Sequence, residues 1–326
     1  MYELLRNRAS LRLRSLVLMA SAAALFSIWG CGGGNGNKAQ PSATEATQAA
    51  PKKFASPGEA GKSLFDAAKS GNQEAIASIF GGGSKDLIST GNATEDKASL
   101  AGFAQAYQVM NRWRKLNDGS ELLLVGADNQ AFPIPLKSAA GQWYFDAAAG
   151  KEELIARRIG RDEIVAIDAC AALAESQQQY FAQKHGGVKQ YAQKFISDPG
   201  QQNGLYWQSP QGSARSPLGP LVAFATEEGL TLKPTDARPF YGYYFHRLDG
   251  QGAAAKGGAK QYVVNGKATA GFGYVAYPAK FDESGVQTFI VNQDGVIYAK
   301  NLGKDTATAA KAMTEFNPDK TWTAVQ

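Results

Sequence analysis

The chain has 326 residues, of which 44% are hydrophobic and 19% charged, and its formal net charge is +5. Four arginines and Glu3 in the first thirty residues contribute +3 of that charge, which leaves +2 for the remainder. Proteins that bind nucleic acid carry a basic patch or stripe, so this weak net charge gives no electrostatic reason to expect nucleic-acid binding. The remaining length of about 270 residues is enough for two domains of ordinary size.

Residues 1–30 have the pattern of a signal peptide. The four arginines precede an Ala- and Leu-rich core at 16–26, which is shorter than the roughly 20 apolar residues that span a bilayer. The core ends in Ser27-Ile28-Trp29-Gly30-Cys31, which resembles a lipobox, although Trp29 occupies a position where smaller residues are usual. We therefore expect lipid on Cys31. The alternative is a plain secretory signal followed by an incidental cysteine.

Residues 31–53 predict a flexible, lipid-anchored linker, because they contain almost no large apolar side chain with which to offset chain entropy. Gly32, rather than Asp, follows the cysteine, and this resembles the default sorting of Gram-negative lipoproteins to the outer membrane. The expected location is the bacterial cell envelope, facing the periplasm. Cys170 has no partner once Cys31 is lipidated, and its helical context predicts a small buried hydrophobe rather than a nucleophile.

An N-terminal domain is predicted over residues 54–150, and it begins with helices. Ser56-Pro57-Gly58-Glu59 is a capping box with proline at the first helical position, so a helix starts there. A second helix over residues 73–80 stops at three glycines, and a third begins at Asn92, with Glu95 three residues later.

Strands follow these helices. After the turn at Asp118-Gly119, residues 121–126, 130–136 and 142–145 predict an antiparallel meander. Its middle run contains two prolines, at 133 and 135, which predict a broken or one-sided strand because proline has no N–H to donate. Helices followed by a curved sheet indicate an α+β layer, which resembles the nuclear-transport-factor-like or cystatin-like cone folds.

The second domain, residues 151–326, is predicted as a long helix packed on an antiparallel sheet. The helix covers 151–185, with a kink or break at Gly160. A Gly-, Pro-, Ser- and Gln-rich connection over 186–239 is of the kind that is often functional or mobile. Strands and a short final helix follow, with hairpin turns at Asn265-Gly266 and Asp294-Gly295. The strands are expected at 243–248, 261–264, 270–277, 286–292 and 296–301, and the helix at 306–313.

Several stretches of the chain resemble a family of bacterial lipoproteins known as domain of unknown function 2950. They are Gly150-Lys-Glu-Glu-Leu-Ile-Ala-Arg-Arg-Ile-Gly-Arg161, Ala174-Glu-Ser-Gln-Gln-Gln-Tyr180, Ser216-Pro-Leu-Gly-Pro220, Tyr243-Tyr-Phe245, Gly271-Phe272 and Gly285-Val-Gln-Thr-Phe289. The resemblance covers nearly the whole mature chain, and it implies no established activity.

Residues 160–302 also resemble the globular head of type IV pilins and pseudopilins. The shared pattern is a helix with Gln-Gln-Gln-Tyr near its end, a Gly- and Pro-rich loop and a meander. Pilins polymerise through an N-terminal apolar helix, and a different domain on a lipid anchor replaces it here. Kinship of fold would therefore not imply filament assembly.

No motif predicts catalysis, a cofactor or a metal site. Gly271-Phe-Gly-Tyr-Val-Ala276 matches a dinucleotide fingerprint formally, but it is strand-like and opens no helix. The two histidines, His185 and His246, lie in different elements without a second ligand at metal-binding spacing. The acids of the long helix are spaced for a solvated face; they are Asp162, Glu163, Asp168 and Glu175.

The C-terminal strands carry the candidate binding surface. Alternate strand positions face outward, and outward tyrosines are good binding residues, so Tyr243, His246 and Tyr274 are the predicted contacts. The alternative is that these side chains only pack within the sheet.

We therefore expect a non-catalytic envelope protein, tied to a membrane by its N-terminal lipid, that binds a protein, peptide or glycan partner through the C-terminal sheet and the preceding loop. One rival is a periplasmic enzyme or small-molecule binder with a pocket in the N-terminal domain, lined by Tyr107, Trp113 or Trp143. Another is an assembly role related to the pilin-like part.

Overall fold

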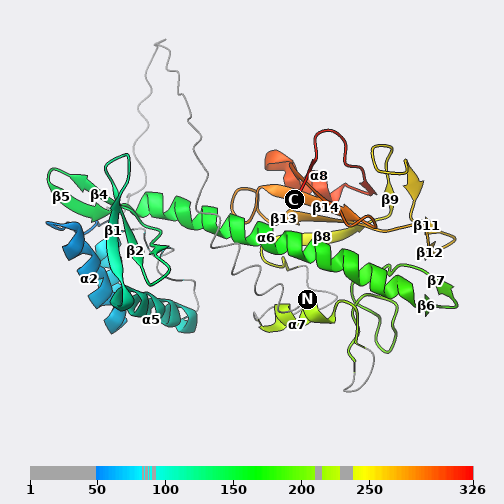
Figure 1. Ribbon diagram of the computed structural model, residues 1–326, viewed down its shortest axis with the longest axis horizontal. Coiled ribbons are helices and arrows are strands. Elements are labelled where there is room, and N and C mark those ends of the chain that lie inside the picture. The colour runs from blue at the N-terminus through cyan, green and yellow to red at the C-terminus, as the bar shows by residue number, and fades with distance from the viewer. Residues whose placement is uncertain are drawn as a thin grey trace, which may run out of the picture. The chain divides into compact units, whose positions relative to one another are not determined.

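The computed structural model describes residues 49–82, 84, 87, 89, 93–209, 215–227 and 238–325 (Figure 1). The predicted signal peptide, Cys31, residues 32–48 of the predicted linker and Asn92 lie outside the described residues. The chain divides into two compact units between Ala156 and Arg157, within one helix. We call 49–156 the N-terminal unit and 157–325 the C-terminal unit. No described helix is both long enough and apolar enough to cross a membrane.

The N-terminal unit begins with the three predicted helices, α2 (Pro57–Ser70), α3 (Gln73–Phe80) and α5 (Ala93–Val109). The predicted capping box forms: Ser56 Oγ accepts a hydrogen bond from the Glu59 amide at 3.2 Å, and the Glu59 carboxylate accepts one from the Ala55 amide at 2.9 Å. The first bond satisfies an amide of the first turn, and the second holds the residue just before the N-cap, so together they fix where α2 begins.

An antiparallel sheet follows, in the order β1-β2-β4-β5 with β3 beside β2 in the described chain. The run containing the two prolines is broken into β3 and β4, as predicted. One strand, β1, was not predicted. Four of its five residues are polar, so the sequence shows no alternation of apolar and polar residues around Trp113. The strands are β1 (Asn111–Lys115), β2 (Glu121–Val125), β3 (Gln130–Ala131), β4 (Leu136–Ala139) and β5 (Gln142–Phe145).

The long helix is α6 (Ala147–Ala182), 36 residues without interruption. The predicted break at Gly160 is wrong, because the helix continues through it; a kink there stays a prediction. A Cβ added at Gly160 would meet nothing within 4 Å. Asp146 caps the start, since its Oδ1 accepts from the Ala149 amide at 3.1 Å. The helix ends earlier than predicted because Lys184 and His185 form the short strand β6 (Lys184–His185), which pairs with β7 (Val188–Lys189).

The C-terminal unit contains an antiparallel sheet in the order β17-β15-β14-β13-β8. Asp294-Gly295 makes the predicted turn between β14 and β15, and Asn265-Gly266 joins β11 (Val263–Val264) to β12 (Lys267–Ala268) with both residues at positive φ. The strands of the main sheet are β8 (Tyr243–Leu248), β13 (Gly273–Pro278), β14 (Gln287–Asn292), β15 (Ile297–Asn301) and β17 (Thr323–Ala324).

Both faces of this sheet are covered. Residues 165–180 of α6 pack on the face that carries Tyr243, Tyr274 and Phe289. The opposite face packs on Ala310 of α8 (Thr306–Lys311) and on Phe316 and Trp322 of the C-terminal tail, residues 312–325. The remaining elements are α7 (Gly219–Glu227), β9 (Gly250–Gln251), β10 (Lys260–Gln261), η1 (Gly303–Asp305) and β16 (Glu315–Phe316).

The α+β class is therefore confirmed, as is the packing of the long helix on a C-terminal antiparallel sheet. The finer resemblances, to a cone fold in the N-terminal unit and to a pilin head in the C-terminal unit, stay predictions.

Candidate functional site

Two of the three predicted contact residues are core residues. Tyr243 is 0% exposed and Tyr274 is 1% exposed. The Tyr243 hydroxyl donates to the Gln287 carbonyl at 2.9 Å, and burial raises the pKa of both phenols. The prediction that these tyrosines face outward is wrong, because the face on which they lie is covered by α6. Alternation along a strand identifies a face, but it does not show whether that face is open.

The third predicted contact, His246, lies on the other face and is half-buried. Its Nε2 is 3.1 Å from the Met313 carbonyl oxygen, which can only accept, so Nε2 carries the proton. The ring also stands edge-on to Tyr277 at 5.9 Å between centroids. A binding role for His246 stays a prediction. Its hydrogen bond to the Met313 carbonyl connects β8 to the residues that follow α8.

Of the four acids predicted to form a solvated face of α6, Glu175 is exposed, whereas Asp162 and Asp168 are buried and Glu163 is half-buried. Asp162 is 3% exposed, and burial raises its pKa against the opposing effect of the Arg161 guanidinium. Glu163 accepts hydrogen bonds from the amides of Val286 and Gln287 at 2.9 and 3.0 Å, so it fastens the start of β14 to the helix. Cys170 is buried as predicted, and burial raises the pKa of its thiol to about 12, which makes it a poor nucleophile.

The Gly- and Pro-rich connection contains an ordered loop, residues 192–207, which we call the 192–207 loop. Its base is fixed by Gln177 of α6, whose side chain is fully buried. Gln177 Nε2 donates to the Ala192 carbonyl at 2.8 Å and to the Tyr274 hydroxyl, and Gln177 Oε1 accepts from the Ala192 amide at 2.8 Å. Both backbone groups of Ala192 are therefore held from the core.

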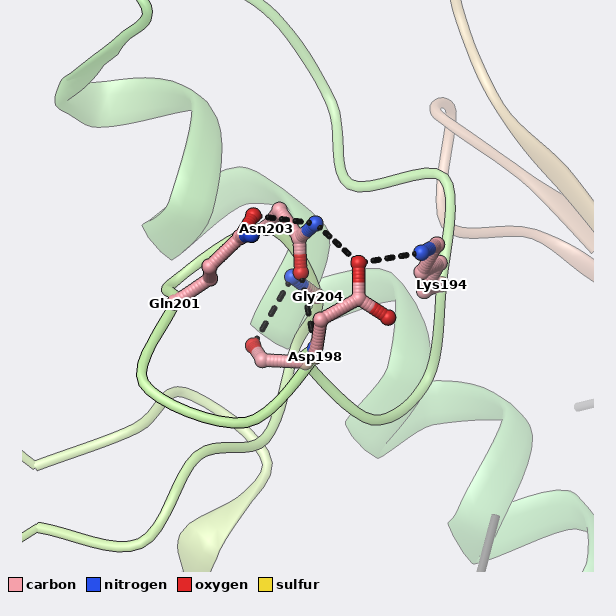
Figure 2. A network of polar contacts seen from close by, with 6 residues as sticks. Lys194, Asp198, Gln201, Asn203 and Gly204 are labelled. Atoms are coloured by element: carbon pink, nitrogen blue, oxygen red, sulfur yellow. Dashed lines mark hydrogen bonds and ion pairs between the residues drawn. The ribbon is translucent and has the colours of Figure 1, made fainter. Parts of the chain in front are cut away.

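A polar turn closes the exposed end of the 192–207 loop (Figure 2). Asp198 Oδ2 accepts from Lys194 Nζ at 2.6 Å and from Asn203 Nδ2 at 2.7 Å, while Asn203 Oδ1 accepts from the Asp198 amide at 3.0 Å. The hydrogen bonds from Lys194 and Asn203 hold the pKa of Asp198 below its ordinary value. The carboxylate is therefore ionised at neutral pH and holds the turn from both sides.

Apolar and backbone contacts fix the rest of the loop. Leu205 is buried in the core, and the Phe195 ring lies 5.3 Å from the Tyr274 ring. The Tyr180 hydroxyl donates to the Gln202 carbonyl at 3.0 Å. At Gly204 any Cβ would come within 2.7 Å of the Ile196 backbone, so only glycine fits. These contacts hold the segments on both sides of the tip, residues 199–202.

The sequence signalled this loop only in part. Ser197-Asp198-Pro199-Gly200 marks a turn by composition, and the connection was predicted to be functional or mobile. Nothing local indicates that Gln177, fifteen residues before Ala192, would supply the anchor.

The N-terminal unit has an open cavity of about 370 Å³. Tyr107, Trp113 and Trp143, the predicted pocket residues, do not line it: Tyr107 and Trp113 pack against Gly61, and Trp143 packs on the core. Asp146 is in the wall, but it caps α6 and pairs with Lys137 at 2.6 Å. The described wall consists of Ala49, Ala50, Pro51, Phe80, Gly82, Leu87, Tyr144, Phe145, Asp146, Ala147, Ala148 and Lys151.

This cavity offers little acid–base chemistry. Burial acts to raise the pKa of Asp146, but the hydrogen bonds from Lys137 and the Ala149 amide outweigh it and leave the pKa below its ordinary value. A carboxylate held in its ionised form by a lysine and a helix start is a poor general acid at neutral pH. The cavity is better suited to holding a small molecule than to converting one.

One comparison with known proteins gave a match. The model of a family described as "Protein of unknown function (DUF2950)" matches residues 51–325. No curated protein and no solved structure matches the chain. The matched range includes almost all of both units, so the two-part chain, rather than either unit alone, is what the family model describes.

Proposed function

The chain belongs to the DUF2950 family, and from its own residues we propose that it is an exported, lipid-anchored envelope protein. In this proposal the C-terminal unit binds a partner, and the protein carries out no reaction on that partner.

The observation that carries the proposal is the fixed conformation of the 192–207 loop. Binding residues are often found on loops held by a rigid scaffold. A loop that is already ordered loses less conformational entropy on binding, which favours affinity. The buried anchor at Gln177 and the Asp198–Asn203 bonds supply that order, while Gln201 and Gln202 at the tip are exposed.

The proposed lipid anchor at Cys31 is inferred from the sequence. The predicted linker ends earlier than residue 53, because the Lys52 amide donates to the Ser78 carbonyl and the Ala49 carbonyl accepts from the Gly82 amide. The 17 residues 32–48, if flexible, have a root-mean-square span of about 23 Å. Such a linker would let the folded units sample partners near the membrane surface without burying either unit in lipid. Retention then depends on the acyl chains, and more than one chain is needed for stable anchoring.

We expect the partner to contact the loop tip. A photo-crosslinking amino acid at Gln202, introduced into the full-length protein in cells, should form a covalent adduct with the partner. The same probe at exposed Lys267 of the C-terminal unit should form none, and Asn203→Ala should reduce the adduct at Gln202 by opening the turn. Adducts confined to probes at Lys62 or Gln73, in the N-terminal unit, would move the binding function there.

Lipid on Cys31 is tested separately. Cys31→Ser should abolish labelling by a fatty acid and release the protein from membranes, because the thiol is the only acceptor of this kind in the predicted lipobox. Cys170→Ser, at a buried thiol, should leave the labelling unchanged. Persistence of the label in the Cys31→Ser protein would show that the assignment is wrong.

A second candidate function is favoured by the cavity of the N-terminal unit. Phe80, Phe145 and Leu87 give it apolar walls, and Lys151 adds a positive charge, a combination suited to a small amphipathic molecule. Mass spectrometry of the mature protein under native conditions tests this alternative, since a bound metabolite would appear as a defined mass increment that disappears on unfolding.

A further inference from the structure

We propose that the outer edge of β8, with which no described strand pairs, receives an extended peptide segment of the partner as an additional strand. The inference rests on the proposed function, since it names the partner's chemical class: a protein segment read through its main chain. Addition of a strand to an exposed edge is a common mode of peptide recognition.

The direction of the β8 backbone groups follows from Tyr243. Its N–H donates to the Phe240 carbonyl at 3.0 Å and its C=O accepts from the Phe240 amide at 2.8 Å, so both groups point away from β13. Its register partner on β13 is Pro278, which has no N–H to offer. Because direction alternates along a strand, Phe245 and Arg247 also point their N–H and C=O groups away from β13.

The open stretch is short and closed at both ends. Among the described residues, no backbone group pairs with the outward groups of Phe245 and Arg247. Phe240 closes one end. Asp249 closes the other, because its N–H donates to the Thr314 carbonyl at 2.9 Å and its C=O accepts from the Tyr262 amide at 2.8 Å. Two outward residues lie about 6.8 Å apart, which suits an added segment of four or five residues.

The β8 edge lacks the features that usually block strand pairing. Proteins protect edges with charged side chains, prolines, bulges or very short strands. The β1 edge of the N-terminal unit has exposed Arg112 and Arg114, and β17, at the other side of the C-terminal sheet, has two residues. By contrast, β8 has six residues in continuous register, and the guanidinium of Arg247 is paired with Asp249 of its own chain.

The 192–207 loop contacts β13, the strand next to β8. The Phe195 ring packs on Tyr274, and Tyr274 pairs with Arg247 in the register of β13 and β8. Phe195 therefore packs on the face of β13, the strand that pairs with β8. A peptide on β8 would gain main-chain hydrogen bonds from the edge, on the same sheet that the loop contacts through Tyr274.

A second copy of this chain fits the edge less well. Antiparallel pairing of β8 with its own copy would bring the Phe240 end of each strand against the Asp249 end of the other. At that end the segments around Thr314 and Tyr262 already occupy the hydrogen-bonding positions. A short peptide of four or five residues can pair with Phe245 and Arg247 without reaching the occupied positions at Phe240 and Asp249.

The first test is amide hydrogen exchange on the free mature chain. The amides of Tyr244, His246 and Leu248 should be protected by β13, whereas those of Phe245 and Arg247 should exchange at least tenfold faster. Protection of Phe245 and Arg247 in the free monomer would show that the edge is occupied by the chain itself, and protection that appears only in a dimer would identify a second copy; either result overturns the proposal.

The second test uses peptides selected on the mature chain from a library of random heptapeptides. Arg247→Pro removes the outward N–H together with the side chain and should weaken their binding at least tenfold, while Arg247→Ala removes the side chain but keeps that N–H and should stay within threefold of wild type. N-methylation of alternate peptide residues should abolish binding to the wild type, and this measurement stands even if Arg247→Pro fails to fold.

Equal binding to the proline and alanine variants, selection of no peptide, or binding that survives N-methylation would overturn strand addition. The adduct at Gln202 separates this failure from failure of the proposed function. If that adduct persists while the β8 variants have no effect, the C-terminal unit binds its partner without using the edge.

Discussion

Gly285→Ala should destabilise the C-terminal unit by about 3 kcal/mol or more, at the upper end of the cost of overpacking a core. An added Cβ would lie 2.1 Å from the Tyr243 hydroxyl oxygen and 2.6 Å from the ring carbon that bears it. Tyr243 cannot withdraw, because it is fully buried and its hydroxyl is bonded to the Gln287 carbonyl. Urea unfolding of the mature chain measures the loss.

Gly160→Ala is the matched control, with the opposite expected sign. A Cβ at Gly160 meets nothing within 4 Å, and alanine is a better helix former, so stability should rise by about 0.5–1 kcal/mol. In a Tyr243→Phe background the cost of Gly285→Ala should fall but not vanish, because the ring carbon remains. An unchanged cost there would show that the clash with Tyr243 is not the cause.

Local signals predicted the elements of the fold well. Residues 243–248 form a strand with the predicted ends, and Ser56 caps α2 as its spacing with Glu59 requires. Predictions failed where a distant contact overrides the local pattern. Gly160 lowers helix propensity, yet residues 165–180 of α6 pack on the C-terminal sheet, and that packing exceeds a propensity cost of about 1 kcal/mol.

The candidate site was predictable only as a region. Tyr243 and Tyr274 were correctly assigned to strands, but whether a strand face is open depends on α6, α8 and the tail, which alternation does not report. The same limit applies to Glu163, whose partners are the amides of Val286 and Gln287, more than 120 residues away. Composition and turn signals indicated the loop, but the pairing that fixes it is not local.

The anchor of the loop gives the second large expected effect. Gln177→Ala should destabilise the C-terminal unit by about 3 kcal/mol, because it leaves the Ala192 amide and carbonyl and the Tyr274 hydroxyl without their partner. Each buried polar group left unsatisfied costs about 1–3 kcal/mol, and water entering the space left by the side chain would offset part of the sum. Gln179→Ala, at an exposed position two residues later on α6, should change stability by less than about 0.5 kcal/mol.

The loop should respond to Gln177→Ala before the unit unfolds. With Ala192 released, its amide should lose hydrogen-exchange protection, residues 194–206 should become sensitive to protease, and the adduct at Gln202 should fall while the β14 and β15 amides stay protected. This order is expected because the core cluster that holds β13, β14 and α6 does not depend on the loop base alone. Local opening and global unfolding separate in such cases. If Gln177→Ala matched Gln179→Ala in protease resistance and in adduct formation, the loop would owe its order to the Asp198–Asn203 turn alone, and the buried anchor would have no part in binding.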